Sequence, residues 1–457
     1  MARPAGRLET AAAPALLAAL PALALLAALP VLLCGCGGPS SPAPTPAPPQ
    51  CVPPTPAPTT DARTKVETIT TVLVGSGGCD GQDAACKDNK TLEAMVVSLG
   101  VDGEGALVSQ QRCWTVPGLP AWLAVRGPAG GARGCLFAVY PDTSSIGIFQ
   151  LELDSLNGGT TAKMVSSVAT KGVNPVFGDV ALEGKYLVVA DYHGPDDVKS
   201  SDGAGVESFA ISADCGLKFV DFREHSGGSG KVPDRQAGAH PHSAVAWGPD
   251  LVFVCDLGAD KIFSYRVEAN GSLSVLSSVD TAAGFGPRHS VPHPTKPMLF
   301  VVGEMGCEVL TYNIDETTGT LTLASSVSTK PNTDPPSYGS KAAEVVISPD
   351  GLHVYASNRA FSPGFRHTVA VFRLMDGGVL EPIQQMDCPS FPRGMAMTPD
   401  GKALLVASQT DGSVVSYQVD PETGLLGEVI STQEGPLGAA AFAVLPELPA
   451  APSELSV

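Results

Sequence analysis

The chain has 457 residues, of which only 16% are charged, and it carries a formal net charge of −18. An acidic chain without a Lys/Arg-rich block argues against nucleic acid or an anionic membrane surface as its partner. The 50 glycines and 41 prolines are typical of many short strands joined by tight turns and disfavour long helices. Length does not fix the domain count, because all-β architectures often run long as one unit.

The N-terminal segment 1–36 has the pattern of a signal peptide. Arg3 and Arg7 precede a stretch of Ala, Leu, Val and Pro over 11–33. That stretch is long enough to cross a bilayer, but its three prolines argue against a membrane anchor. It ends in LCGC, which resembles a bacterial lipobox with Cys36 as the lipidated residue. We expect an exported protein, either periplasmic, extracellular or held at the membrane surface only by a lipid anchor.

The rest of the chain divides into a spacer, one domain and a tail. Residues 37–63 are rich in Pro, Ser and Thr and are expected to form an extended linker, because they cannot bury a core. Regular strand patterns begin near residue 65, so the domain is expected over 64–446. Residues 447–457 are expected to be a disordered tail.

The eleven cysteines are scattered, and none forms a CxxC pair, so structural zinc is not expected. Cys79 and Cys86 bracket a short polar loop and can form a disulfide in an oxidising compartment. Cys255 and Cys307 lie inside strand-like segments. We expect these two to be small buried side chains.

A turn followed by an apolar strand recurs along the domain, as in GPDLVFVCDLGADKIFSY, SPDGLHVYASNR and TPDGKALLVASQ. The interval is close to the period of about 40 to 50 residues that is typical of propeller blades. Several units continue with an alternating strand and an Asn-Gly or Asp-Gly type of turn, as in FSYRVEANGSL, which indicates a hairpin.

Four antiparallel strands per unit follow, and such units must close into a ring to bury both of their faces. We predict an all-β, seven-bladed β-propeller of four-stranded antiparallel blades. Its opening strand at 66–74 and closing strand at 439–444 would share one blade. A β-sandwich is the rival fold, but it does not require a repeating interval.

Four segments in order along the chain carry a family resemblance: RQAGAHPHSAV, GFGPRHSVPHP with VVGEMG, AAEVVISPDGLHVYASNR and FPRGMAMTPDGKALLVASQ. Together they resemble the seven-bladed propeller lactonases. That family includes the bacterial propeller 6-phosphogluconolactonase and the fungal carboxy-cis,cis-muconate cyclising enzyme. The likeness extends from about residue 173 to residue 426. It implies a monomeric hydrolase that opens a sugar-acid lactone in the central cavity, with no cofactor and no metal.

The resemblance also assigns site residues. The positions that match the family's working groups are His242, Arg288, Glu304 and Arg359. Further candidates for substrate binding are His240, His193, His225 and Arg366. The turn 362–367 is longer than in the family. Arg366 lies in this turn and is therefore included as an alternative to Arg359. Ser290, Val291 and Pro292 also replace the family's apolar residues after GPRH.

Opening a lactone needs a base to take the proton of the attacking water and donors to hold the oxyanion. We prefer His242 as the base, with Glu304 orienting it or the water; Glu304 as base is the alternative. If Glu304 lies between two arginines, its pKa should fall. The alternative without catalysis is that these charged residues only pair with one another and stabilise the fold. His289 and His293 are expected to face solvent or backbone.

Two other functions stay open. The same groups suit the reverse type of reaction, cyclisation of a carboxylated acid, and a propeller can also bind a ligand or protein without catalysis. An enzyme should bring the four matched residues together in one open cavity. Because the protein is expected to be exported, a non-phosphorylated lactone is as plausible as a phosphorylated one.

GGSGKV at Lys231 resembles a phosphate-binding loop, but Val232 replaces the required Ser or Thr and no βαβ unit surrounds it.

Overall fold

The computed structural model describes residues 70–76, 95–128, 134–153, 160–193, 201–335, 339–435 and 438–445. The chain divides into two compact units, Met1–Ala47 and Pro48–Val457, and every described residue belongs to the second. The predicted signal peptide, lipobox, linker and tail, and the Cys79–Cys86 pair, lie outside the described residues. Within the described ranges, no helix is long and apolar enough to span a membrane.

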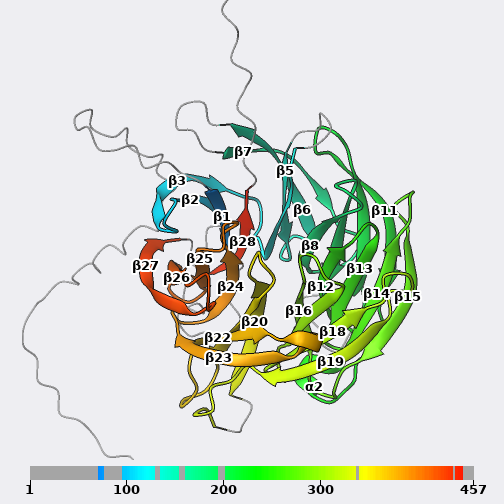
Figure 1. Cartoon of the computed structure of the whole chain (residues 1–457). Coiled ribbons are helices and arrows are strands. Elements are labelled where there is room, and N and C mark those ends of the chain that lie inside the picture. Colours follow the sequence, from blue (N-terminus) through cyan, green and yellow to red (C-terminus); the bar gives the residue numbers. More distant parts are fainter. Residues whose placement is uncertain are drawn as a thin grey trace, which may run out of the picture. The chain divides into compact units, whose positions relative to one another are not determined.

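The described residues form seven four-stranded antiparallel sheets, numbered here as blades 1 to 7 (Figure 1). Blade 1 contains β28 (Ala439–Val444), β1 (Thr70–Ser76), β2 (Met95–Val101) and β3 (Leu107–Thr115). Blade 2 contains β4 (Trp122–Arg126), β5 (Cys135–Tyr140), β6 (Ser145–Leu153) and β7 (Thr160–Ala169). Blade 3 contains β8 (Pro175–Ala181), β9 (Tyr186–Asp191), β10 (Gly205–Ile211) and β11 (Leu217–Glu224).

Blade 4 contains β12 (Pro241–Trp247), β13 (Leu251–Asp256), β14 (Lys261–Val267) and β15 (Leu273–Asp280). Blade 5 contains β16 (Pro287–Pro292), β17 (Met298–Gly303), β18 (Glu308–Ile314) and β19 (Leu321–Ser328). Blade 6 contains β20 (Ser340–Ile347), β21 (His353–Ala360), β22 (Thr368–Leu374) and β23 (Leu380–Asp387). Blade 7 contains β24 (Pro392–Met397), β25 (Ala403–Ser408), β26 (Ser413–Val419) and β27 (Leu426–Glu434). The short helices are α2 (Pro233–Gln236) and η1 (Asp376–Gly378).

The ring closes as the sequence predicts. The last strand β28 pairs with the first strand β1, with Val444 opposite Val72, and Figure 1 shows the red strand beside the blue one. The innermost strands contact one another in a cycle that runs β4, β8, β12, β16, β20, β24, β28 and back to β4. Seven separate sheets exclude the sandwich. The described part of the opening strand, 70–76, overlaps the predicted 66–74.

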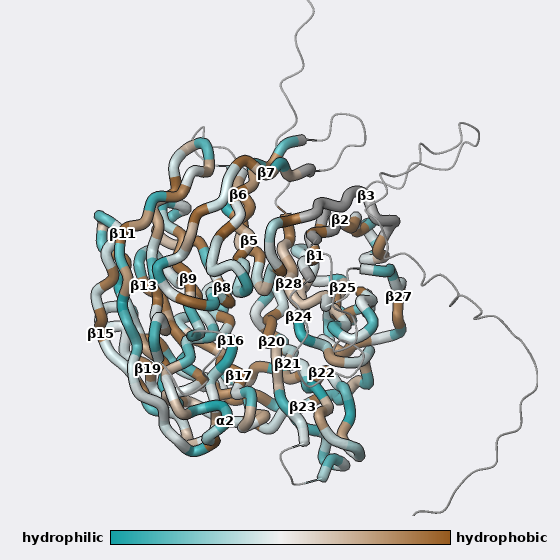
Figure 2. Tube along the Cα trace, turned by 180° about the vertical axis from the view of Figure 1, so that it is seen from behind, coloured by the Kyte–Doolittle hydropathy of each residue, from teal (hydrophilic) through white to brown (hydrophobic). Residues whose placement is uncertain are grey.

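Stacking between neighbouring blades explains the strand composition. The middle strand β13 (LVFVCD) is buried along its whole length, because a blade is covered on both faces. The outer strand β15 instead alternates between half-buried and exposed residues after a buried start. Figure 2 shows the same contrast in blade 3, with hydrophobic colour on β9 and hydrophilic segments on β11. Cys255 and Cys307 are free and buried, as predicted.

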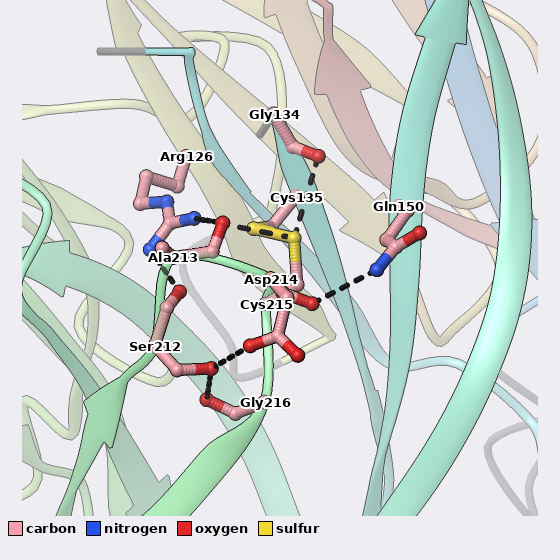
Figure 3. The surroundings of a disulfide bond; sticks show 9 residues. All are labelled: Arg126, Gly134, Cys135, Gln150, Ser212, Ala213, Asp214, Cys215 and Gly216. Carbon is pink, nitrogen blue, oxygen red and sulfur yellow. Dashed lines mark hydrogen bonds between the residues drawn. A yellow bond between two sulfur atoms is a disulfide. The ribbon is translucent and has the colours of Figure 1, made fainter. Parts of the chain in front are cut away.

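A disulfide that the sequence did not predict joins Cys135 on β5 to Cys215, and both cysteines are fully buried (Figure 3). Cys215 lies in the turn that connects β10 and β11. Gln150 donates a hydrogen bond from Nε2 to the carbonyl of Asp214 in that turn, at 3.0 Å. Arg126 donates from Nη1 to the carbonyl of Ser212, at 2.9 Å. Blades 2 and 3 are therefore linked covalently and by hydrogen bonds.

Replacing both Cys135 and Cys215 with Ala is expected to lower the free energy of unfolding by about 2 to 4 kcal/mol, because the bond closes a long loop in the unfolded chain. Urea unfolding without reductant measures the change. The matched control is Cys388→Ala, which removes a thiol that is not in a disulfide. An unchanged unfolding midpoint in the double variant would show that this link does not stabilise the ring.

Blade 3 also buries two carboxyl groups on adjacent strands, Asp191 and Glu207, each with 0% exposure. Within the described ranges, neither oxygen of Asp191 has a hydrogen-bond partner, and one oxygen of Glu207 lacks one as well. Burial and the neighbouring Glu207 raise the pKa of Asp191 well above its ordinary value. Burial raises the pKa of Glu207 to about 7. The folded protein therefore keeps protons here that the unfolded chain releases at a lower pH.

Stability should consequently fall as pH rises from the ordinary carboxyl range toward about 7, because the folded state binds more protons over that window. Asp191→Asn is expected to raise the free energy of unfolding by about 1 to 3 kcal/mol at pH 8 and to change it little at pH 5. Urea unfolding at the two pH values tests this, with the exposed Asp280→Asn as control. Equal effects at both pH values would contradict the explanation that the folded protein keeps protons on these two carboxyl groups.

Candidate active site

A bulge at the start of several innermost strands places the key side chains. His242 is an extra residue between Pro241 and Ser243, which pair with adjacent residues of β13. Arg288 in β16 and Arg393 in β24 occupy the same position, each directly after a proline. Because proline cannot donate to the ladder and the bulged residue is left unpaired, the bulge re-aims its side chain. All three side chains line one cavity.

The ends of the second strands supply the remaining groups. Glu304 follows β17, Arg359 lies near the end of β21, and Tyr192 follows β9. All three line the same cavity of about 930 Å³, which receives residues from blades 2 to 7. Gly286, which precedes the Pro-Arg pair of β16, adopts a φ of +61°, and a Cβ there would collide with the side chain of Met305.

The cavity is strongly cationic. Its charged lining residues are Lys231, Asp234, Arg235, Arg288, Glu304, Lys341, Arg359 and Arg393. Six are basic and two are acidic, an excess of four positive charges in a chain whose formal net charge is −18. An excess of one sign around a cavity favours a ligand of the opposite sign.

Glu304 is the hub of this charge cluster. Its Oε2 lies 3.3 Å from Arg288 Nε and accepts a hydrogen bond of 3.2 Å from Arg359 Nη2. Its Oε1 accepts a hydrogen bond of 2.6 Å from Arg235 Nη2 and lies 3.9 Å from Lys341 Nζ. Burial by itself would raise the pKa of Glu304, but the four cations outweigh it and hold the pKa well below the usual value. The predicted fall is confirmed, and Glu304 is ionised at neutral pH.

His242 is buried beside this cluster, and its Nδ1 has no hydrogen-bond partner among the residues that the structure describes. Its ring meets those of His289 and Tyr192 edge to face, at centroid distances of 5.0 and 5.5 Å. Burial lowers its pKa well below the usual value, and the charges of Arg288 and His289 lower it further. The imidazole is therefore neutral at pH 7 and able to accept a proton.

Backbone carbonyls of blade 6 fix the two buried arginines. Arg288 donates from Nη1 to the carbonyl of Ala343 at 2.7 Å, and Arg359 donates from Nη2 to the carbonyl of Ala342 at 3.1 Å. Burial, Arg359 and Arg393 lower the pKa of Arg288 to about 9, which leaves the guanidinium protonated at neutral pH. Both groups are thus rigid cations with forked donors.

His289 corrects one expectation, because it is buried and does not face solvent or backbone. The bulge at Arg288 shifts the alternation of the strand. The ring of His289 therefore packs edge-on against Trp122 and Phe177 and contacts Glu344 at 2.9 Å. His293 does face backbone, as expected, with Nδ1 accepting from two N–H groups at 3.1 and 3.0 Å.

The four matched residues thus line one cavity, whereas the four further candidates are not among its lining residues. His240 stacks on Tyr192 at a centroid distance of 4.6 Å, and His193 packs against His240 at 4.6 Å. Both rings therefore pack against Tyr192, which itself lines the cavity.

His225 and Arg366 make structural contacts elsewhere. His225, which follows β11 of blade 3, hydrogen-bonds Asp256 through Nδ1 and Tyr265 through Nε2, each at 2.8 Å, so both ring nitrogens are already used in contacts with blade 4. Arg366 pairs with the exposed Asp387 at 3.1 Å, which holds it at the surface. It therefore does not replace Arg359. Phe361 is the residue near this turn that reaches the cavity.

Sequence reasoning missed Arg235, Lys341 and Arg393. A signal existed for Arg393, because FPRG repeats the Pro-Arg of GPRH at the start of another blade's first strand. Arg235 is the first residue of RQAGAHPHSAV, but in that segment the resemblance pointed only to the histidines. Lys341 lacks a local signal, since only the register of β20 brings it opposite Arg359.

Seven blades form a ring around a cationic cavity that holds an imidazole, a carboxylate and guanidinium groups. This arrangement defines a propeller protein whose cavity has side chains suited to acid–base chemistry. The chain belongs to the family described as Lactonase, 7-bladed beta-propeller, whose model matches residues 88–441. The resemblance drawn from the four sequence segments is thereby confirmed.

Relatives and solved structures agree with this assignment. A probable 6-phosphogluconolactonase of Arthroderma benhamiae is 31% identical over 295 residues, covering 60% of this chain and 68% of the relative. The 6-phosphogluconolactonase of Bacillus subtilis is 25% identical over 347 residues, covering 75% and 92%. The crystal structure of a Lactobacillus plantarum protein matches with a TM-score of 0.68 at 26% identity, covering 82% and 99%. The periplasmic gluconolactonase of Pseudomonas aeruginosa shares the fold, with a TM-score of 0.69 at 22% identity, covering 83% and 99%.

Proposed function

We propose that this protein is a hydrolase that opens a sugar-acid lactone in the cavity between its blades. The observation that carries the proposal is the convergence of His242, Arg288, Glu304 and Arg359 on one cavity of about 930 Å³. That volume lies within the range of ligand pockets, about 300 to 1,000 Å³. Membership of the lactonase family supports the choice of reaction.

The geometry supports a specific division of labour. Water attacks the lactone carbonyl, and His242 takes the proton from that water, since its imidazole is neutral and its Nδ1 has no partner within the described part of the chain. Arg288 and Arg359 donate to the oxygen that becomes negative. The ester bond to the ring oxygen then breaks, and that oxygen leaves as a hydroxyl after taking a proton from the imidazolium.

Glu304 fits a positioning role better than the role of base. Both of its carboxylate oxygens are already occupied by cations, Oε1 by Arg235 and Lys341 and Oε2 by Arg288 and Arg359. It keeps Arg288 and Arg359 in place through Oε2. These contacts favour His242 as the base, the assignment preferred from the sequence.

The direct test uses the purified protein with D-glucono-1,5-lactone, its 6-phosphate and a homoserine lactone, following proton release against the uncatalysed rate. Acceleration of a sugar lactone that saturates with concentration supports the proposal. Absence of acceleration with all three substrates contradicts it and favours a propeller that only binds its ligand.

We propose further that the chain is exported as a monomer, with processing near Cys36. The apolar N-terminal stretch and the Cys135–Cys215 disulfide support this, because disulfides persist mainly in oxidising compartments. Cell fractionation and lipid labelling of wild type and Cys36→Ser separate a lipid anchor from plain secretion, and size-exclusion chromatography reports the oligomeric state. Recovery of the full-length chain in the cytoplasm would contradict export.

A further inference from the structure

Two kinds of cation bind Glu304, and they differ in exposure. On the Oε2 side, the side chains of Arg288 and Arg359 are 1% and 2% exposed. On the Oε1 side, the side chains of Arg235 and Lys341 are 27% and 25% exposed. The buried pair is also held by backbone carbonyls. The side chains of the outer pair are therefore the ones exposed enough to change partners when a ligand enters the cavity.

Arg235 is carried by a short segment that is tied to blade 4 on both sides. Gln236 of α2 donates to the carbonyl of Leu257 at 2.9 Å and to Asp260 Oδ1 at 2.6 Å. Before α2, the N–H of Ser229 donates to the carbonyl of Gly258 at 2.9 Å, and the N–H of Gly230 donates to the carbonyl of Gln236 at 2.8 Å. These bonds fix the backbone, whereas the long Arg235 side chain, which is 27% exposed, can change partners by rotation about its own bonds.

The positive charge of the cavity lining favours a change of partner for Arg235 when an anionic ligand binds. Among the cations that lower the pKa of Glu304, Arg235 has the largest effect. Its guanidinium contacts Oε1 at 2.6 Å and is of the shape that binds a carboxylate or phosphate through two parallel hydrogen bonds. An anionic group near the cavity mouth therefore competes with Glu304 for Arg235, and the excess positive charge of the lining stabilises that group.

We propose that Arg235 is a specificity-determining residue that exchanges Glu304 Oε1 for the anionic substituent, phosphate or carboxylate, of the lactone. This inference rests on the proposed hydrolysis. Once Arg235 binds the substituent, Glu304 Oε1 becomes able to accept a hydrogen bond from the attacking water near His242. Recognition of the anionic group thus strengthens the orientation of the water, and anionic lactones gain in kcat as well as in affinity.

The kinetic test compares wild type, Arg235→Gln and Arg235→Lys with D-glucono-1,5-lactone, its 6-phosphate, and a glucarolactone that carries a carboxylate instead. Arg235→Gln removes both the group that binds the anionic substituent and the cation that occupies Glu304 Oε1. It is therefore expected to lose at least tenfold in kcat/KM on the anionic lactones, mainly through KM, while kcat becomes nearly equal for neutral and anionic lactones. Arg235→Lys should lie between. The control is Arg373→Gln, which breaks the exposed pair with Glu381 outside the cavity. An equal loss on neutral and anionic lactones, or no loss on either, overturns the inference.

A binding measurement separates this inference from the proposed function. Inorganic phosphate, titrated into the protein by calorimetry, is expected to bind at least fivefold more weakly to Arg235→Gln than to wild type or Arg373→Gln. Equal affinities would refute the role of Arg235 whatever the activity. If wild type is inactive on all lactones but the phosphate difference appears, the hydrolase assignment fails while the anion-binding role of Arg235 stands.

Discussion

Replacing Glu304 with Gln should lower lactone hydrolysis about a hundredfold or more and reduce the free energy of unfolding by about 3 to 5 kcal/mol. The amide keeps the shape of the side chain but removes the charge that Arg288 and Arg359 share. Both guanidinium groups are 1% exposed and cannot recover water as a partner. Two buried cations then repel each other, which destabilises the fold and misplaces the donors for the oxyanion.

Urea unfolding and steady-state kinetics measure the two effects, and added phosphate distinguishes their cause. Because the deficit is one of negative charge, phosphate should restore more stability to Glu304→Gln than to wild type. Glu381→Gln, which breaks an exposed pair with Arg373, is the control and should change neither quantity appreciably. A Glu304→Gln protein with wild-type stability would mean that the cluster does not depend on this carboxylate.

Replacing His242 with Ala should cost about a hundredfold or more in kcat, the usual range for loss of a general base, while cooperative unfolding is retained. The imidazole is neutral, and its Nδ1 has no partner among the described side chains and backbone groups, so its removal leaves no charge unpaired. Arg288 and Glu304 keep their mutual contact in this variant. A fully active His242→Ala protein would end the assignment of this residue as the base.

The pH profile gives a second check on His242. The basic form of the residue is the neutral imidazole, and a lowered pKa keeps it neutral to lower pH. The acidic limb of kcat/KM should therefore lie below about 6.5, the ordinary histidine value. A bound anionic lactone offsets the charge of Arg288, so the limb of kcat should lie at higher pH than that of kcat/KM. A limb of kcat/KM above about 6.5 would contradict this reading.

The sequence by itself determined the fold and the four central residues. Apolar strands separated by turn residues at a nearly constant interval can bury both faces only by stacking in a ring, so seven blades and the pairing of 439–444 with the first strand followed from local pattern. His242, Arg288, Glu304 and Arg359 were found because each lies in a short segment that resembles the lactonase family.

The tertiary structure decided which charges meet. Arg235, Lys341 and Arg393 come from three different parts of the chain, and only the closed ring and the position of α2 bring them around Glu304 and His242. The same holds for His225 and Arg366, whose partners Asp256 and Asp387 lie on other strands. Strand patterns depend on residues next to each other in sequence, whereas electrostatic partners are chosen by distance in space, which a local pattern does not contain.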